Sequence, residues 1–210
     1  MAAPQDPQDP APRRRMSAED RRGTILTAAA HAFGERGYNA TTIAAIAAAA
    51  GVSKPMVYRH FESKKALYLF LLAKHREDLP TFFAGIELAP GGSAEAALRL
   101  ILERWFGYVA THSHAWKMLF RDRTGDDEIQ AFRADVSRRA REVIAGFIEA
   151  LGGTVPPAQV APTAELLTSG LAGLALWSID HPDFDRSDLI AVAVRIAAPA
   201  FPPETPASRQ

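Results

Sequence analysis

The feature that most constrains the fold is a pair of very short helical segments separated by a tight turn. The first begins at Thr41 or Thr42, residue types that cap helix N-termini, and Gly51 ends it. The second follows at once and carries Val57 and Phe61, which are four residues apart and therefore share one side of a helix. Two short helices joined by a glycine-containing turn of about three or four residues are typical of a helix-turn-helix.

Composition extends the helical prediction to the whole chain. Of the 210 residues, 48% are apolar, and alanine, the strongest helix former, is abundant. No segment shows sustained strand-like alternation of apolar and polar residues. We therefore predict an all-α fold of about nine helices, with a three-helix head and a helical-bundle body. The predicted organisation is a disordered tail over residues 1–16, a helix-turn-helix domain over 17–65, a helical body over 66–200 and a flexible C-terminal tail over 201–210.

Helix ends are predicted from capping residues, glycine and proline. Ser17 is expected to cap the first helix, and Gly37 is expected to end it near Arg36 in the left-handed conformation. Ser63 is expected to begin a fourth helix that runs to Pro80. Body helices are expected near residues 98–109, 115–120, 126–151, 163–179 and 188–198.

The formal net charge is zero, but the charges are unevenly distributed along the chain. Residues 13–65 contain ten basic and four acidic side chains, so the N-terminal part carries +6 and the remainder −6. A basic head on an acidic body is expected when one end of a protein meets a polyanion such as nucleic acid. A chance cluster of basic residues is the alternative interpretation.

Several function classes are disfavoured by what the sequence lacks. Without cysteine there are no disulfides or thiolate metal sites, which suits a reducing cytoplasm. The first 15 residues lack the apolar segment of a signal peptide, and no apolar run approaches the roughly 20 residues of a membrane span, so a cytoplasmic protein is expected. His112 and His114 are two residues apart and do not share a helix face, and no nucleophile elbow or phosphate-binding glycine loop is present. We therefore expect no enzyme activity, no metal and no cofactor.

Four short motifs follow one another within residues 20–70: Gly37 to Thr42, Ile46-Ala47, Gly51 to Phe61 with the run Val57-Tyr58-Arg59-His60-Phe61, and Ser63 to Leu67. With these motifs, residues 20–70 closely resemble the TetR family of bacterial transcriptional regulators. The resemblance implies a homodimer that binds operator DNA, most often as a repressor. It also implies that a small molecule bound in the body releases the protein from DNA.

Candidate DNA-binding residues lie on and around the second short helix. Because Val57 and Phe61 define the inward side, the other side chains of this helix are expected to face outward, where they suit a major groove. The resemblance assigns phosphate contacts to Thr42, Tyr58, His60 and Lys64, and base contacts to Lys54, Pro55, Met56 and Arg59. Alternatively, Tyr58 and His60 pack against neighbouring helices and Lys64 complements a helix end. Arg13 to Arg15 either reach a minor groove or make no fixed contact.

The body is rich in aromatic residues, which favours a small hydrophobic or aromatic effector. The candidate ligand-binding residues are Trp105, Phe106, Tyr108, Trp116, Phe120, Phe147 and Trp177. An aromatic stripe at helical spacing is also what an ordinary core requires, so plain core packing is the alternative.

The last two helices are the candidate dimer interface, because the resemblance implies that they pair across a two-fold axis and because they carry little polar surface. The candidate interface residues are Leu167, Gly170, Leu171, Leu174, Leu189, Val192 and Ile196. Burial of this face within one chain is the alternative. Two other functions stay open at this point: an architectural DNA binder without an effector, and a small-molecule enzyme that carries a helix-turn-helix.

Overall fold

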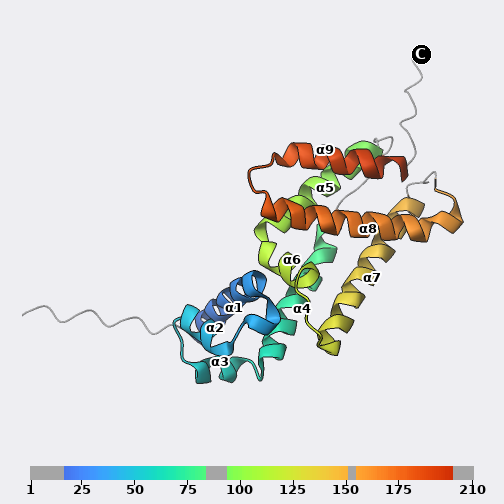
Figure 1. The fold of residues 1–210 in the computed structure, drawn as a ribbon. Coiled ribbons are helices and arrows are strands. Elements are labelled where there is room, and N and C mark those ends of the chain that lie inside the picture. Colours follow the sequence, from blue (N-terminus) through green and yellow to red (C-terminus); the bar gives the residue numbers. More distant parts are fainter. Residues whose placement is uncertain (1–16, 84–93, 151–154, 201–210) are drawn as a thin grey trace, which may run out of the picture.

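The computed structural model describes residues 17–83, 94–150 and 155–200, and within these ranges the chain is all-α, as predicted (Figure 1). The elements are α1 (Ala18–Ala40), α2 (Ile43–Ala49), α3 (Lys54–His60), α4 (Lys64–Phe83), α5 (Ala94–Thr111), α6 (Ser113–Phe120), α7 (Asp127–Ala150), α8 (Pro157–Asp180), α9 (Arg186–Ala197) and a 3₁₀ turn, η1 (Ala198–Ala200). The tails predicted over residues 1–16 and 201–210 lie outside the described residues. None of the described helices is long and apolar enough to cross a membrane.

The helix starts in the head follow the capping residues. Ser17 forms a capping box with Asp20, each side chain bonding the other residue's backbone N–H. The hydroxyl of Thr42 accepts a hydrogen bond from the N–H of Ala45 at 3.1 Å, and that of Ser63 accepts one from Ala66 at 3.0 Å. Ser53 occupies the N-cap position of α3 without a side-chain bond. Three of these four N-cap residues therefore form a side-chain capping hydrogen bond.

The predicted end of the first helix near Arg36 is confirmed only in part, because the helical backbone breaks at Gly37 but α1 continues beyond it. Gly37 does have a positive φ of 77°, but its ψ of 169° is extended, and a further helical turn continues to Ala40. The hydroxyl of Thr41 donates to the carbonyl oxygens of Ala32 and Gly37, at 3.0 and 2.8 Å, and holds this extra turn against the helix. Gly37 therefore marks a kink in α1, and a side chain here would be strained by the backbone conformation alone.

The predicted start of α8 at Thr163 is wrong, because the helix begins six residues earlier and contains Pro162 in its interior. Pro157 occupies a position at the helix start where a missing N–H costs little. Val160 and Ala164, on either side of Pro162, are buried, and Val160 packs in one apolar cluster with Ile148 of α7. Burial against α7 therefore offsets the hydrogen bond that Pro162 removes.

One hydrophobic core runs from the head into the body. It joins Ile25 and Phe33 of α1 and Val57 of α3 to Leu67 of α4 and Met118 of α6. The core therefore crosses the domain boundary proposed at residue 65. Smaller apolar clusters lie between α5 and α9 and between α7 and α8.

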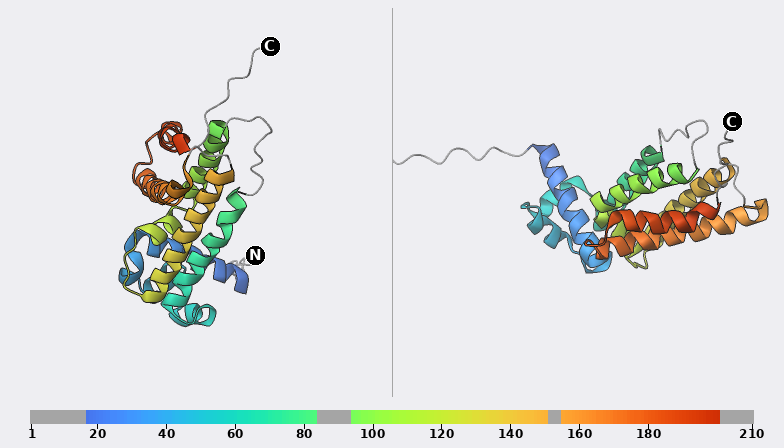
Figure 2. Two further views of the ribbon diagram at one scale, coloured as in Figure 1. Left: turned by 90° about the vertical axis from the view of Figure 1, so that its right-hand side faces the viewer. Right: turned by 90° about the horizontal axis from the view of Figure 1, so that it is seen from above.

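The helices are arranged so that α4 and α7 run from the head along the body (Figure 1). Helices α8 and α9 lie side by side on one flank of the body in all the views (Figure 2). The head thus presents α2 and α3 at one end, and the flank formed by α8 and α9 belongs to the body alone.

Candidate nucleic-acid interface and internal cavity

Helix α3 is held to the head by one side and leaves the other side open. Val57 has no exposed surface, and Phe61, which follows the helix, is 6% exposed. The exposed side chains are Lys54, Pro55, Tyr58 and Arg59. This orientation is the one that the spacing of the two apolar residues predicts, while the contacts of these side chains with DNA stay predictions.

The outward residues of α3 contact one another only weakly. The guanidinium of Arg59 lies 3.6 Å from the sulfur of Met56, and the ammonium of Lys54 lies 5.9 Å from the ring centre of Tyr58. Met56 and His60 are half-buried at the edges of the face. Because these contacts are weak, Arg59 and Lys54 can exchange them for base edges or phosphates at little cost.

Thr42 and Lys64 lie beside this face and already have partners within the chain. The hydroxyl oxygen of Thr42 caps α2, which leaves its O–H able to donate to a phosphate. The ammonium of Lys64 donates to the carbonyl oxygens of Tyr38 and Thr41, at 2.8 and 3.0 Å, and lies 4.2 Å from the ring centre of Tyr38. Lys64 thus complements the C-terminal end of α1, which is the alternative role considered for it in the sequence analysis. Its third N–H leaves a phosphate contact as a prediction.

A buried polar junction, which the sequence analysis did not predict, connects the head to the body. The Oδ2 atom of Asp122, which follows α6, accepts hydrogen bonds from the backbone N–H of Tyr38 at 2.7 Å and from the hydroxyl of Tyr68 at 2.8 Å. Arg133 of α7 donates to the hydroxyl oxygen of Tyr68 and to the carbonyl of Met118, both at 2.7 Å, and lies 3.7 Å from Asp122. Burial raises the pKa of Tyr68 well above its ordinary value, so its O–H stays a donor. Four helices therefore meet at one polar cluster, in which Nε of Arg133 is buried without a hydrogen-bond partner.

Helix α6 also packs directly against α1 through Glu35. The ammonium of Lys117 donates to Glu35 at 2.8 Å and lowers the pKa of that carboxyl, and His114 lies 3.4 Å from the same oxygen. Burial lowers the pKa of His114, and the nearby His31 adds to the effect. A Cβ atom on Gly34 would lie 2.7 Å from the Cβ of His114, so α1 and α6 are in close contact here.

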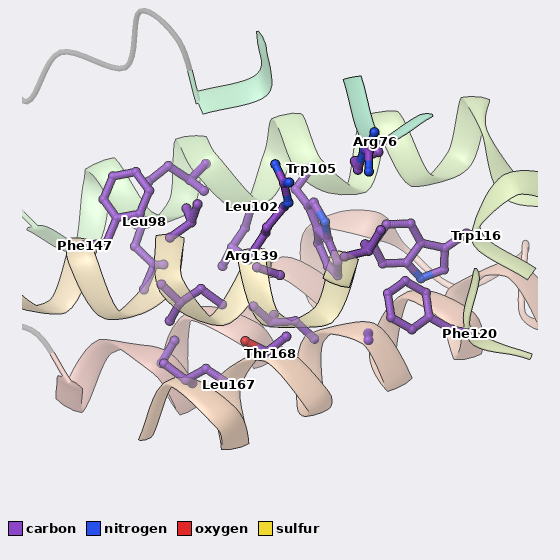
Figure 3. A pocket seen from close by; sticks show the side chains of 18 residues that line it. Arg76, Leu98, Leu102, Trp105, Trp116, Phe120, Arg139, Phe147, Leu167 and Thr168 are labelled. Atoms are coloured by element: carbon purple, nitrogen blue, oxygen red, sulfur yellow. The ribbon is translucent and has the colours of Figure 1, made fainter. Parts of the chain in front are cut away.

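The body contains an apolar cavity of about 250 Å³ (Figure 3). Helices α4 to α9 all contribute to its wall. Its lining residues are Arg76, Leu98, Ile101, Leu102, Trp105, Trp116, Phe120, Val136, Arg139, Ala140, Val143, Ile144, Phe147, Leu167, Thr168, Leu171, Ala172 and Ala197. The cavity therefore brings together Trp105, Trp116, Phe120 and Phe147, four of the candidate ligand-binding residues.

The other three candidates do not line this cavity. Phe106 is buried in the cluster between α5 and α9. The hydroxyl of Tyr108 lies 3.0 Å from a ring nitrogen of His75, and the Trp177 ring stacks on His181 with centroids 4.0 Å apart. Each of these side chains is turned by the helical twist to another face of its helix than the cavity-lining residues.

The flank formed by α8 and α9 exposes large apolar side chains. Leu166 is 69% exposed, Trp177 38% and Ile196 63%, and a Cβ atom on Gly170 or Gly173 would meet nothing within 4 Å. Of the candidate interface residues, Gly170 and Ile196 are exposed, and Leu171, Leu174 and Val192 are half-buried. Leu167 and Leu189 are only 8% and 5% exposed. For these two residues the alternative interpretation, burial within one chain, describes the structure. Leu166 and Trp177, which are exposed on α8, are not among the candidate interface residues.

The head of this chain matches a known protein family. Residues 25–70 match the model of the bacterial regulatory proteins of the tetR family. The chain is 36% identical over 108 residues to the HTH-type transcriptional activator FasR of Mycolicibacterium smegmatis, a match that covers 50% of this chain and 48% of FasR. It is 29% identical over 133 residues to the HTH-type transcriptional repressor KstR2 of Rhodococcus jostii, covering 62% of this chain and 64% of KstR2. The matches thus span about half to two thirds of these curated relatives.

The fold is similar to that of solved regulators over nearly its whole length. The crystal structure of a TetR-like transcriptional regulator from Rhodococcus sp. RHA1 superposes with a TM-score of 0.71 at 26% identity. This similarity covers 88% of the present chain and 97% of the Rhodococcus chain.

Proposed function

Because the chain belongs to the TetR family of bacterial regulatory proteins, we propose that it is a transcriptional regulator that binds an inverted-repeat operator as a homodimer. In this proposal a small hydrophobic or aromatic effector occupies the body cavity and releases the protein from DNA. The observation that carries the proposal is the outward side of α3, where Lys54, Tyr58 and Arg59 are exposed while Val57 is fully buried.

Operator recognition is assigned to α3 in a major groove. Arg59 suits bidentate contact with a guanine, and Pro55 and Met56 suit thymine methyl groups. Phosphate contacts by Thr42, Tyr58, His60 and Lys64 would fix the register of the head on the duplex.

Dimerisation is assigned to the flank formed by α8 and α9. Leu166 and Ile196 expose apolar surface there, and Gly170 and Gly173 allow close approach of a partner helix. A two-fold axis through this flank would present two α3 helices to successive major grooves, which requires a spacing of about 34–36 Å.

Release by the effector is assigned to a rigid-body change in head spacing. Helix α4 links head and body, and α6 carries Trp116 and Phe120 to the cavity while packing against α1. An effector that favours a wider spacing of the two heads weakens operator binding by that difference in free energy.

The direction of regulation is assigned as repression. The two curated relatives carry opposite names, since FasR is an activator and KstR2 a repressor. If the protein is a repressor as proposed, deletion of its gene should raise transcription of the operator-linked genes. A fall in their transcription would show that the protein is an activator.

Selection from a random duplex pool tests the DNA-binding proposal. The purified protein should enrich an inverted repeat, and its affinity should fall linearly with the logarithm of salt concentration as counterions are released. Fluorescence anisotropy on the selected duplex, with a scrambled duplex as control, measures both effects. A protein without salt-sensitive affinity for any duplex would not be a DNA-binding regulator.

A further inference from the structure

The wall of the cavity has a pronounced chemical asymmetry. Apart from the indole N–H groups of Trp105 and Trp116, only Thr168, Arg76 and Arg139 carry polar groups among the described residues that line it, and the two charged ones are both arginines. Arg76 comes from α4 and Arg139 from α7, and Figure 3 shows both guanidinium groups along one edge of the cavity, near Trp105. A purely hydrophobic ligand would place no hydrogen-bond acceptor opposite these two cations.

These arginines share one carboxylate. Asp135 accepts a hydrogen bond from Nε of Arg139 at 2.8 Å, is paired with Arg138, and lies 3.6 Å from the guanidinium of Arg76. Glu142 pairs with the other side of Arg138 at 2.7 Å. Three arginines thus meet two acids, which leaves a net formal charge of +1 at this edge. The positive charge that Asp135 leaves uncompensated is available to a bound anion.

We propose that the effector is an amphiphile whose acidic group binds Arg76 and Arg139 while its apolar part fills the cavity. This inference rests on the proposed function, in which the cavity holds the effector. The planar fork of an arginine matches a carboxylate or a phosphate in a two-point hydrogen bond. The same arginines disfavour a cationic ligand of equal hydrophobicity, so charge selects among ligands that the apolar wall accepts alike.

The cavity size restricts the apolar part. Its volume of about 250 Å³ lies just below the roughly 300–1,000 Å³ usual for ligand pockets, which favours a slender ligand such as an alkyl chain. The side chain of Arg139 is 58% exposed, so the acidic end of the ligand lies close to solvent. A free carboxylate and the phosphates of a coenzyme A thioester would both supply the acidic group there.

A matched ligand series on the purified protein without DNA tests the proposal. Saturated fatty acids from octanoate to hexadecanoate are compared with the primary alcohols and the alkyltrimethylammonium salts of the same chains, below their micelle concentrations. Trp105 and Trp116 line the cavity, so intrinsic tryptophan fluorescence reports binding, and calorimetry confirms the affinities. Acyl-coenzyme A thioesters of the same chains distinguish a free carboxylate from the phosphate-bearing form.

The expected result is a preference for the acid over the alcohol by about tenfold or more, with the cation weakest. Arg139→Gln and Arg76→Gln should each remove most of this preference and leave the alcohol affinity nearly unchanged. Arg141→Gln is the matched control, because Arg141 lies on the same helix but pairs with Glu165 and does not line the cavity.

Three outcomes would overturn the inference: equal affinity for acid and alcohol, a preference that survives in Arg139→Gln, or no binding by any acid or thioester in the series. Operator binding is measured separately on the same preparations. A protein that binds operator DNA without discriminating among these ligands refutes this inference alone. One that discriminates among ligands but binds no duplex refutes the DNA-binding function alone.

Discussion

The carboxylate of Asp122 accepts a hydrogen bond of 2.7 Å from the backbone N–H of Tyr38, a residue 84 positions earlier in the chain. Tyr38 directly follows the kink at Gly37, and Asp122 directly follows the helix that carries Trp116 and Phe120 to the cavity. The bond therefore joins the end of the head's first helix to the part of the body that contacts the cavity.

Removing this carboxylate should destabilise the protein. Asp122→Ala leaves the N–H of Tyr38 without an acceptor and the half-buried Arg133 without its anion, at a cost of about 3 kcal/mol in free energy of unfolding. Urea denaturation measures the loss. Asp127→Ala, at an exposed position in the first turn of α7, is the control and should change stability far less. Equal losses in the two variants would contradict a special role for the junction.

Two glycines of α1 should respond to alanine in opposite directions. Gly34→Ala places a Cβ 2.7 Å from the Cβ of His114, so α1 and α6 must move apart, at about 1–3 kcal/mol. Gly23→Ala meets nothing within 4 Å in the same helix and should stabilise the protein by about 0.5–1 kcal/mol. Thermal unfolding compares the two. A stabilised Gly34→Ala would show that the contact between α1 and α6 is looser than the geometry indicates.

Stability should fall on mild acidification, partly because of His114. Its pKa in the folded protein is lowered from 6.5, first by burial and then by His31, whereas Glu35 opposes the shift. The unfolded chain therefore binds this proton more readily, so the stabilising contribution is complete above pH 6.5 and is lost as the pH falls toward the folded pKa. His114→Gln should flatten the dependence of unfolding free energy on pH between about 7.5 and about 5.5. The exposed His181→Gln should leave it steep, and an unchanged slope in His114→Gln would count against this assignment.

Arg59→Ala should cost about 1–3 kcal/mol in operator binding and relax the preference at the base it reads. Lys64→Ala should weaken binding to all sequences alike, flatten the salt dependence, and also lower stability because two carbonyl groups lose their donor. Arg104→Ala, exposed on α5, is the control for a lost positive charge. A changed sequence preference in Lys64→Ala would mean that base and phosphate contacts are assigned the wrong way round.

Leu166→Arg should split the proposed dimer. A charged side chain at the centre of the flank formed by α8 and α9 should raise the dimer dissociation constant on the order of 100-fold. Leu100→Arg changes an exposed leucine of α5 in the same way and should leave the dimer intact. Light scattering across a concentration series separates the two. A dimeric Leu166→Arg would place the interface elsewhere.

The sequence predicted those features that depend on residues close together in the chain. The four-residue spacing of Val57 and Phe61 was enough to orient α3, and Ser17, Thr42 and Ser63 were enough to place three helix starts. The start of α8 was predicted too far along the chain. The helix continues through Pro162 because of tertiary burial, which local helix propensity does not reveal.

Features that depend on long-range contacts escaped the sequence analysis. Nothing in the local sequence around Asp122 and Arg133 indicates that folding brings them to Tyr38 and Tyr68. Arg139 lies by spacing beside the apolar stripe of α7, between Val136 and Val143, and only the packing of the other body helices shows that it belongs to a cavity wall. Four of the seven aromatic candidates line the cavity and three do not, since helical spacing cannot tell which of several packed faces encloses a void.

The apolar core that passes from α1 and α3 into α4 and α6 has a practical consequence for protein engineering. In a chimaera that joins this head to an unrelated ligand-binding module at residue 65, Ile25, Phe33 and Val57 would lose their packing partners on α4 and α6. A chimaeric biosensor should therefore take the inner faces of α4 and α6 together with the head. The DNA-binding head then keeps the apolar surface against which it folds.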